Sequence, residues 1–390
     1  MNSLTATVVL ALVAASQAAV TDYPEPPQIF DALSNTKYMK HSGKSRAGTI
    51  NIEFPAADGT DDYIKLGRID LVGDSATRGY DYGKMLAHEI IKFVDHDLNK
   101  FYIDMVMDLN FDTSGLPEGL QKILNAVKVV GAHKAPDLFN EAFTWVYENE
   151  KQYFPQHLID EMNGMGEGIC ATLGGDCSNE EMTSKIMSVN MLPELIKMAC
   201  TAYGAWGKAN SISNNGTLTQ VRALDFGTGP WGNNTVIVTH RNPLDNNMRP
   251  FVSVSFPGLV GAITGIAKDG VGISEKVWMV SDSDSRSNLQ PGRYDGVPDV
   301  FALREILQNT KNRAEAEMYV NSIRRTWGMW VGIGDFESQQ LDLVAYRRED
   351  AIVYTDVTTP SMTSQPFLEN VAYVDRHPQP SNDQVLPTAL

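Results

Sequence analysis

The residue in this chain best suited to chemistry is Cys200. It opens a run of small and aromatic residues that ends at Trp206, and the next run of similar character carries Arg222 and Asp225, three residues apart. A cysteine thiolate is a strong nucleophile, and neighbouring charges control how much of a thiol is ionised. The spacing therefore predicts nucleophilic catalysis by Cys200, with Arg222 and Asp225 as its charge partners.

Each of these residues also has an ordinary structural interpretation. A free cysteine is usually a small buried hydrophobe, and an Arg–Asp pair at a strand end often forms a surface salt bridge. Residues 222 and 225 face opposite sides of a regular strand, so the strand must end or bulge there if both side chains are to reach the sulfur. Ala202 and Gly204 leave room beside the sulfur, which favours the catalytic interpretation.

The sequence offers no histidine near Cys200 as a base; the closest one downstream is His240. The α-amino group of Cys200 itself would serve, because its unperturbed pKa is about 7.7–8.0. That base exists only if the chain is cut between Ala199 and Cys200, which we expect. A papain-like Cys–His hydrolase is a further alternative, but the sequence around Cys200 lacks the Cys-Gly-x-Cys-Trp context of that class.

The N-terminal sequence indicates secretion. Residues 1–18 resemble a signal peptide, with an apolar run over 5–15 that is too short to cross a bilayer. Two N-glycosylation triplets, at Asn215 and Asn233, agree with that assignment. In an oxidising compartment we expect Cys170 and Cys177 to form a disulfide, which leaves Cys200 free; the alternative is three unrelated buried cysteines.

Composition excludes several other classes of function. The net charge of −16 argues against nucleic acid or an anionic membrane as partner. No His, Asp and Glu residues stand at metal-ligand spacing, and no nucleotide-binding loop is present, so we expect neither a metal nor a cofactor. No later apolar run is long enough for a membrane span.

Hydrophobic periodicity predicts a mostly helical first half and a strand-rich second half. Residues 19–48 are expected to be a poorly packed leader, followed by strands at 49–54 and 63–71. Helices are expected from Ser75 through Phe93, and at 98–109, 116–131, 136–149 and 155–170. The second half predicts strands at 200–206, 218–225, 234–240, 251–256, 259–266 and 271–279, helices at 298–308 and 313–325, then strands at 328–334, 340–347 and 350–355.

Four segments in order resemble one known family. They are Gly73–Leu86, Glu161–Gly168, the Cys200 and Arg222–Asp225 segments, and Gly258–Gly265 followed by Gly270–Ser274. Together they are similar to the peptidase C45 and acid ceramidase-like family of N-terminal-nucleophile hydrolases, whose relatives include penicillin acyltransferase and choloylglycine hydrolases. The resemblance covers about residues 60–377.

The resemblance implies an α+β fold, an αββα four-layer sandwich preceded by a mostly helical segment. It implies autocleavage into two fragments that stay bound to each other. The N-terminal fragment comprises residues 19–199, and the catalytic fragment comprises residues 200–390. It also makes Cys200 the nucleophile, Asp225 the residue that binds its α-amine, and Arg222 the residue that orients the thiol. The substrates it implies are small N-acyl amides or lipid amides, and the location is outside the cell or in a lysosome-like acidic lumen.

One late segment departs from the family pattern. The relatives carry a Thr-Asn-Tyr-Asp segment whose Asn helps form the oxyanion hole, whereas here Tyr373 stands in place of that Asn. Asn370, His377 or backbone N–H groups are the alternative donors. The departure keeps a second class of function open, a secreted or lysosomal binding protein that retains the fold without turnover.

Overall fold

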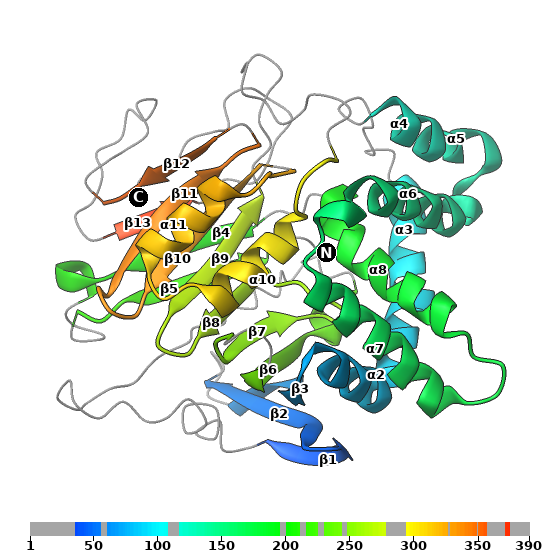
Figure 1. Ribbon diagram of the computed structural model, residues 1–390, viewed down its shortest axis with the longest axis horizontal. Coiled ribbons are helices and arrows are strands. Elements are labelled where there is room, and N and C mark those ends of the chain that lie inside the picture. Colours follow the sequence, from blue (N-terminus) through cyan, green and yellow to red (C-terminus); the bar gives the residue numbers. More distant parts are fainter. Residues whose placement is uncertain are drawn as a thin grey trace.

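The computed structural model describes residues 36–55, 61–107, 117–195, 200–210, 216–224, 230–243, 248–277, 294–326, 328–348, 350–356 and 371–374. Over these ranges the fold is α+β, as the sequence predicted: two stacked β-sheets, helices against the larger sheet, and a helical half beside them (Figure 1). The predicted signal peptide, residues 1–18, lies outside the described residues.

In the described part of the chain the larger sheet has ten strands, and both halves of the chain contribute to it. All neighbours are antiparallel except β3 and β6, which run parallel with Ile69 opposite Val238. In spatial order the strands are β1 (Lys37–Ser42), β2 (Ser45–Pro55), β3 (Asp61–Gly73), β6 (Val236–Pro243), β7 (Phe251–Ser255), β8 (Thr264–Ala267), β9 (Val271–Val277), β10 (Met329–Asp335), β11 (Gln340–Tyr346) and β12 (Ala351–Tyr354). The expected cut after Ala199 would therefore divide one continuous sheet between two fragments.

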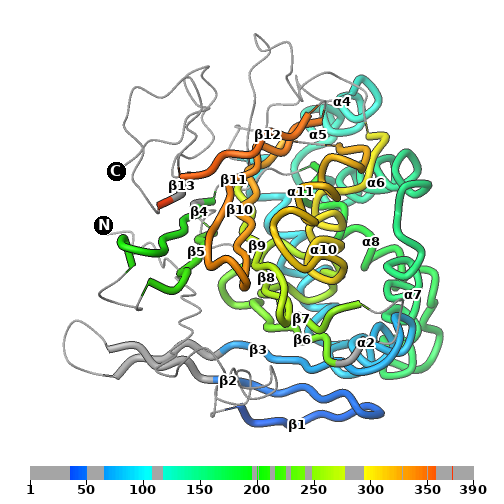
Figure 2. Tube along the Cα trace, turned by 60° about the vertical axis from the view of Figure 1, so that its left-hand side comes forward, coloured from blue at the N-terminus to red at the C-terminus, as the bar shows by residue number. Residues whose placement is uncertain are grey.

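The smaller sheet, which has three strands among the described residues, lies on one face of the larger one. Its order is β13 (Val371–Val374), β4 (Cys200–Ala205), β5 (Thr219–Leu224). Helices α10 (Asp299–Asn309) and α11 (Arg313–Ser322) cover the opposite face, against β8 to β12 (Figure 2). The described residues thus form three successive layers, helix, sheet and sheet, of the four in the expected αββα sandwich.

The helical half lies to one side of the large sheet, with α2 (Ser75–Lys92) in contact with β1, β2 and β3 (Figure 1). It begins with α2, whose first turn is capped by Asp74: its carboxylate accepts from Thr77 N at 2.8 Å. The other helices are α3 (Asn99–Met107), α4 (Glu118–Asn125), α5 (Val127–Val130), α6 (Ala135–Glu150), α7 (Gln156–Leu173) and α8 (Asn179–Leu195), with a π-helical turn at Phe93–Leu98.

The glycines that the sequence placed in two motifs allow α2 and α7 to touch backbone to backbone. A Cβ added at Gly79 would lie 2.0 Å from Glu161 O, and one at Gly83 would lie 2.0 Å from Met165 O. The contact is reciprocal, since a Cβ at Gly168 would lie 2.1 Å from Tyr80 O. Only glycine fits at such a crossing, so these motifs are explained by helix packing.

The same crossing buries a charged cluster that joins both halves of the chain. The Glu161 carboxylate on α7 accepts from Arg304 Nη2 on α10 at 2.8 Å and from Arg78 Nη2 on α2 at 3.3 Å. All three residues are almost fully buried. Burial alone would raise the pKa of Glu161, but the two guanidinium groups outweigh it and lower the pKa. We call Arg78, Glu161 and Arg304 the helix-crossing cluster.

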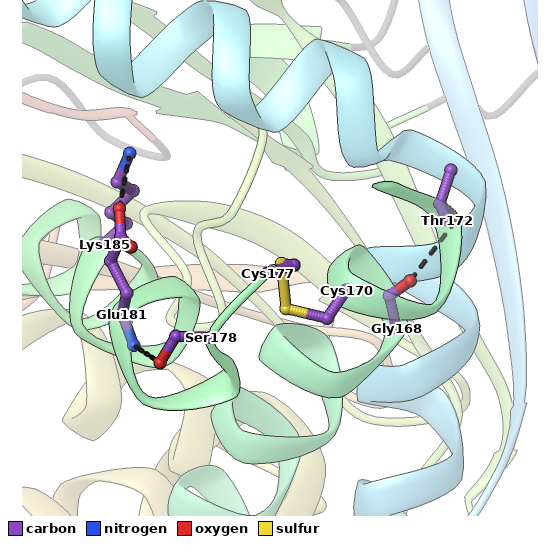
Figure 3. The surroundings of a disulfide bond; sticks show 7 residues. All are labelled: Gly168, Cys170, Thr172, Cys177, Ser178, Glu181 and Lys185. Atoms are coloured by element: carbon purple, nitrogen blue, oxygen red, sulfur yellow. Dashed lines mark hydrogen bonds and ion pairs between the residues drawn. A yellow bond between two sulfur atoms is a disulfide. The ribbon is translucent and has the colours of Figure 1, made fainter. Parts of the chain in front are cut away.

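The disulfide predicted between Cys170 and Cys177 is confirmed, with a Cα–Cα distance of 5.2 Å. It ties the last turn of α7 to the segment that precedes α8 (Figure 3). Ser178 follows directly, and its Oγ accepts from Glu181 N at 3.3 Å at the start of α8. Cys200 is the free cysteine, as expected.

The structure corrects the sequence-based expectations in three places. Residues 19–48 are not all leader, because β1 and the start of β2 form a hairpin within that range. Helix α8 was not predicted, since it is buried around most of its circumference and lacks a one-sided pattern. The strand predicted at 259–266 begins only at Thr264, because the Asn190 side chain accepts from Val260 N and Gly261 N and donates to Gly258 O. Those bonds occupy the backbone groups that a strand ladder would use.

Candidate active site

Cys200 lies at the first position of β4, between the two sheets. It pairs with Leu224 of the neighbouring strand β5. The small sheet packs closely on the large one here: a Cβ at Gly204 would lie 2.7 Å from Leu341 Cδ1. Trp206 fills the same interface with Trp330 and Leu343. The sulfur is therefore completely buried in the intact chain.

The Arg222 side chain contacts the sulfur of Cys200. Its Nη2 donates to Cys200 Sγ at 2.8 Å and to Glu275 Oε2 at 3.1 Å, and its Nε donates to the Glu275 carbonyl at 3.2 Å. The thiol in turn contacts Glu275 Oε2 at 3.7 Å. We call Cys200, Arg222 and Glu275 the thiol cluster. One guanidinium thus serves both a thiol and a carboxylate.

Electrostatics keep this thiol protonated in the intact chain. Burial is the largest influence on the Cys200 thiol, and its pKa is raised to about 12. Arg222 and Lys276 act to lower this pKa, whereas Glu275 acts to raise it. Arg222 therefore acts in the direction predicted from the sequence but does not overcome burial and the carboxylate. A neutral thiol is a poor nucleophile, so an additional positive charge or a base is needed for reactivity.

Glu275 is the member of the cluster that the sequence analysis missed. It stands in β9, in the run Ile273-Ser274-Glu275-Lys276, directly after the glycine-rich segment that the family resemblance singled out. Both Glu275 and Lys276 are buried. A Glu–Lys pair inside an otherwise apolar strand was the available signal, because buried charges are rare unless they are paired.

Several predicted site residues lie outside the described residues. These are Ala199, Asp225, Asn370, His377 and the glycosylation site Asn215. Tyr373 is placed by its backbone: it lies on β13 opposite Tyr203 of β4, so the late segment runs beside the strand that carries Cys200. Because β5 ends at Leu224 opposite Cys200, Asp225 follows directly after the residue paired with the candidate nucleophile.

The remaining sequence candidates have mixed outcomes. Asn233 is exposed in a single 3-10 turn, as an acceptor for a glycan requires. Trp231 and Phe256 are core residues whose ring centroids lie 5.0 Å apart. Within the described ranges, no group of three or more His, Cys, Asp or Glu side chains could hold a metal ion, and no helix is long and apolar enough to cross a membrane.

Comparison with known proteins places the chain in a family. No family model matches it. The Dictyostelium discoideum protein dcd1A is 30% identical over 335 residues, which cover 83% of this chain and 69% of dcd1A. Protein dcd1B of the same organism is 28% identical over 339 residues, 85% of this chain and 61% of its own length. The chain belongs to the dcd1 family, and it spans about two thirds of the length of these two relatives.

A solved structure was also matched. An N-acylethanolamine-hydrolyzing acid amidase ortholog from Caenorhabditis elegans is 17% identical, with 40% of this chain and 64% of that chain covered, at a TM-score of 0.31. A TM-score this low lends no weight to a shared fold or activity.

Proposed function

We propose that this protein is a cysteine N-terminal-nucleophile hydrolase or acyltransferase that acts on N-acyl amide bonds. The observation that carries the proposal is the thiol cluster: a free, buried cysteine at the start of a strand, with an arginine donating to its sulfur at 2.8 Å. A cysteine that is merely core has no need of a guanidinium partner. The catalytic residues in this proposal are Cys200, Arg222 and Asp225.

Self-cleavage is the first step we propose. Cys200 Sγ attacks the carbonyl carbon of Ala199, the C–N bond to Cys200 breaks, and the thiol proton goes to the released α-amine. Water then hydrolyses the thioester, which leaves a carboxylate at Ala199 and a free thiol. The new ammonium at Cys200 adds positive charge beside the sulfur, and this lowers the pKa that burial raises in the intact chain.

In turnover, the same sulfur attacks the carbonyl carbon of an N-acyl amide. The α-amine of Cys200 takes the thiol proton and gives it to the leaving amine, and water or another nucleophile releases the acyl group from the thioester. Asp225, next to the residue opposite Cys200, would hold the α-amine. Oxyanion donors from Asn370, Tyr373, His377 or the backbone remain part of the proposal.

The two fragments would stay together after such a cut. Strand β3 would remain paired with β6 across the division, and Glu161 on the N-terminal side would still bind Arg304 on the other. The N-terminal fragment is thus the partner we propose for the catalytic fragment.

We also propose a secreted or acidic-vesicle location. A disulfide between Cys170 and Cys177 is typical of an oxidising compartment, and Asn233 is exposed within a glycosylation triplet. The N-terminal signal-like sequence supports the same location.

A second candidate function is a binding protein that keeps the fold without turnover. The complete burial of Cys200, with its pKa raised to about 12, favours that alternative for the intact chain. A panel of N-acyl amides with different acyl chains and amines separates the two. The enzyme should release amine from at least one member, and Cys200→Ala should abolish release while thermal unfolding stays unchanged. Equal release by both proteins would make Cys200 structural.

A further inference from the structure

Gln220 bridges the two sheets two residues before Arg222. Its Nε2 donates to Ser274 Oγ at 2.9 Å and to the Gly332 carbonyl at 3.1 Å. The side chain thus leaves β5 and ends on β9 and β10 of the opposite sheet. Neither the family resemblance nor the catalytic assignment uses this residue.

Glycines on the opposite sheet make room for the Gln220 amide. A Cβ added at Gly272 would lie 2.8 Å from Gln220 Oε1, and one at Gly334 would lie 2.4 Å from the same atom. Real side chains do not tolerate such distances, so any other residue at either position displaces the amide. The large sheet is therefore shaped to receive a glutamine from the small one.

Gln220 and Arg222 make successive contacts from one face of β5. Residues i and i+2 of a strand point to the same side. Gln220 binds Ser274, and Arg222 binds the carbonyl of Glu275, the next residue of β9. The first contact therefore sets where β5 lies along β9 when the second is made.

We propose that Gln220 is a positioning residue, which fixes β5 against β9 and β10 so that Arg222 Nη2 meets the sulfur of Cys200. The inference rests on the proposed function, because it assigns Gln220 a role at that same site. Gln220 does not touch the sulfur and acts through Arg222. A displacement of about 1 Å in a reacting geometry costs about 10²-fold in rate, so this anchor matters for chemistry.

The test begins with the full-length Gln220→Leu protein, which keeps the side-chain size and loses both hydrogen bonds. Cys200 is the single free thiol, so the S–H stretching band in a Raman spectrum reports on it alone. Compared between uncut chains, we expect the band to move from its wild-type frequency toward that of Arg222→Met, which removes the donor to the sulfur. Self-cleavage should slow by about 10²-fold.

A double-mutant cycle separates positioning from general packing. Gly272→Ala pushes on the Gln220 amide and should shift the S–H band in the same direction, whereas in a Gln220→Ala background it should have no effect. Gly232→Ala is the matched control, because a Cβ there meets nothing within 4 Å. If Gln220→Leu does not fold, Ser274→Ala removes one acceptor and should give a smaller shift of the same sign.

The outcomes are distinct for the two levels of the proposal. A folded Gln220→Leu protein with an unchanged S–H band would overturn the positioning role, whatever happens to cleavage, and so would a Gly272→Ala effect that persists without Gln220. A shifted band in a protein whose wild type never cleaves would support the positioning role and count against the proposed hydrolase.

Discussion

The helix-crossing cluster and the thiol cluster are both buried, and both contain arginine and glutamate. In the first, two guanidinium groups surround one carboxylate, and the pKa of Glu161 is lowered in spite of burial. In the second, one guanidinium is shared between Glu275 and the sulfur, and the pKa of Cys200 is raised to about 12. The two clusters differ in how much positive charge each acidic group receives.

That difference separates a structural role from a chemical one. A carboxylate with two arginine partners stays ionised. The helix-crossing cluster therefore has a structural role, because it holds α2, α7 and α10 together. A thiol that lacks enough positive charge stays neutral until its surroundings change. Release of an α-amine at Cys200 is the change we propose, because the ammonium would supply the missing charge.

The largest effect is expected from breaking the helix-crossing cluster. Glu161→Gln removes the buried carboxylate that Arg78 and Arg304 share, and the free energy of unfolding should fall by about 3–5 kcal/mol. Urea denaturation measures this loss. Glu167→Gln is the control, because Glu167 lies exposed on the same helix. A loss below about 1 kcal/mol would show that the cluster is not a structural centre.

An intermediate effect is expected at the thiol cluster. Glu275 raises the pKa of Cys200, so Glu275→Gln should lower it and increase the thiolate fraction about tenfold at a given pH. In the uncut chain, thiolate absorbance followed between about pH 8 and 10 detects the change, since a thiol of pKa about 12 stays protonated there. Exposed Glu337 provides the control, Glu337→Gln. An unchanged titration would mean that Glu275 does not act on the sulfur.

The smallest effect is expected where charges are only partly buried. Burial and Asp342 raise the pKa of Glu317 on α11 to about 7, above its usual 4.5. The folded protein holds this proton more tightly, so its stabilisation is present below pH 4.5 and is lost as the pH rises through about 7. Solvent screening at this half-exposed site limits the effect to about 0.5–1 kcal/mol.

The corresponding test compares wild type with Glu317→Gln. The wild-type melting temperature should fall between about pH 5 and 7.5 relative to the variant, whose side chain does not titrate in that range. If the melting temperatures of wild type and variant change equally between these two pH values, the pKa of Glu317 is not raised as we describe.

Much of this architecture follows from local sequence patterns. The helix from Ser75 and the strands around Cys200 and Arg222 were predicted within a few residues, because their apolar spacing is regular. The disulfide followed from cysteine parity. Helix α8 was missed because a helix buried on most sides has no amphipathic pattern.

What the sequence could not supply depends on contacts between distant segments. Glu275 meets Cys200 only because two sheets stack, and the two residues lie 75 positions apart. The same stacking explains why Gln220 can bridge the two sheets. In the sequence it is an ordinary polar residue of a strand, and only the structure shows the glycines that face its amide. The raised pKa of the Cys200 thiol likewise depends on burial, which the spacing of residues in the sequence does not reveal.

The central claim is that Cys200 becomes the first residue of a new chain. N-terminal sequencing of the purified full-length protein, together with its intact mass, tests this most directly. We expect two N-termini, one of which reads Cys-Thr-Ala-Tyr, and a single uncut chain for Cys200→Ala. An enzyme that hydrolyses N-acyl amides while residue 199 remains joined to Cys200 would contradict the account.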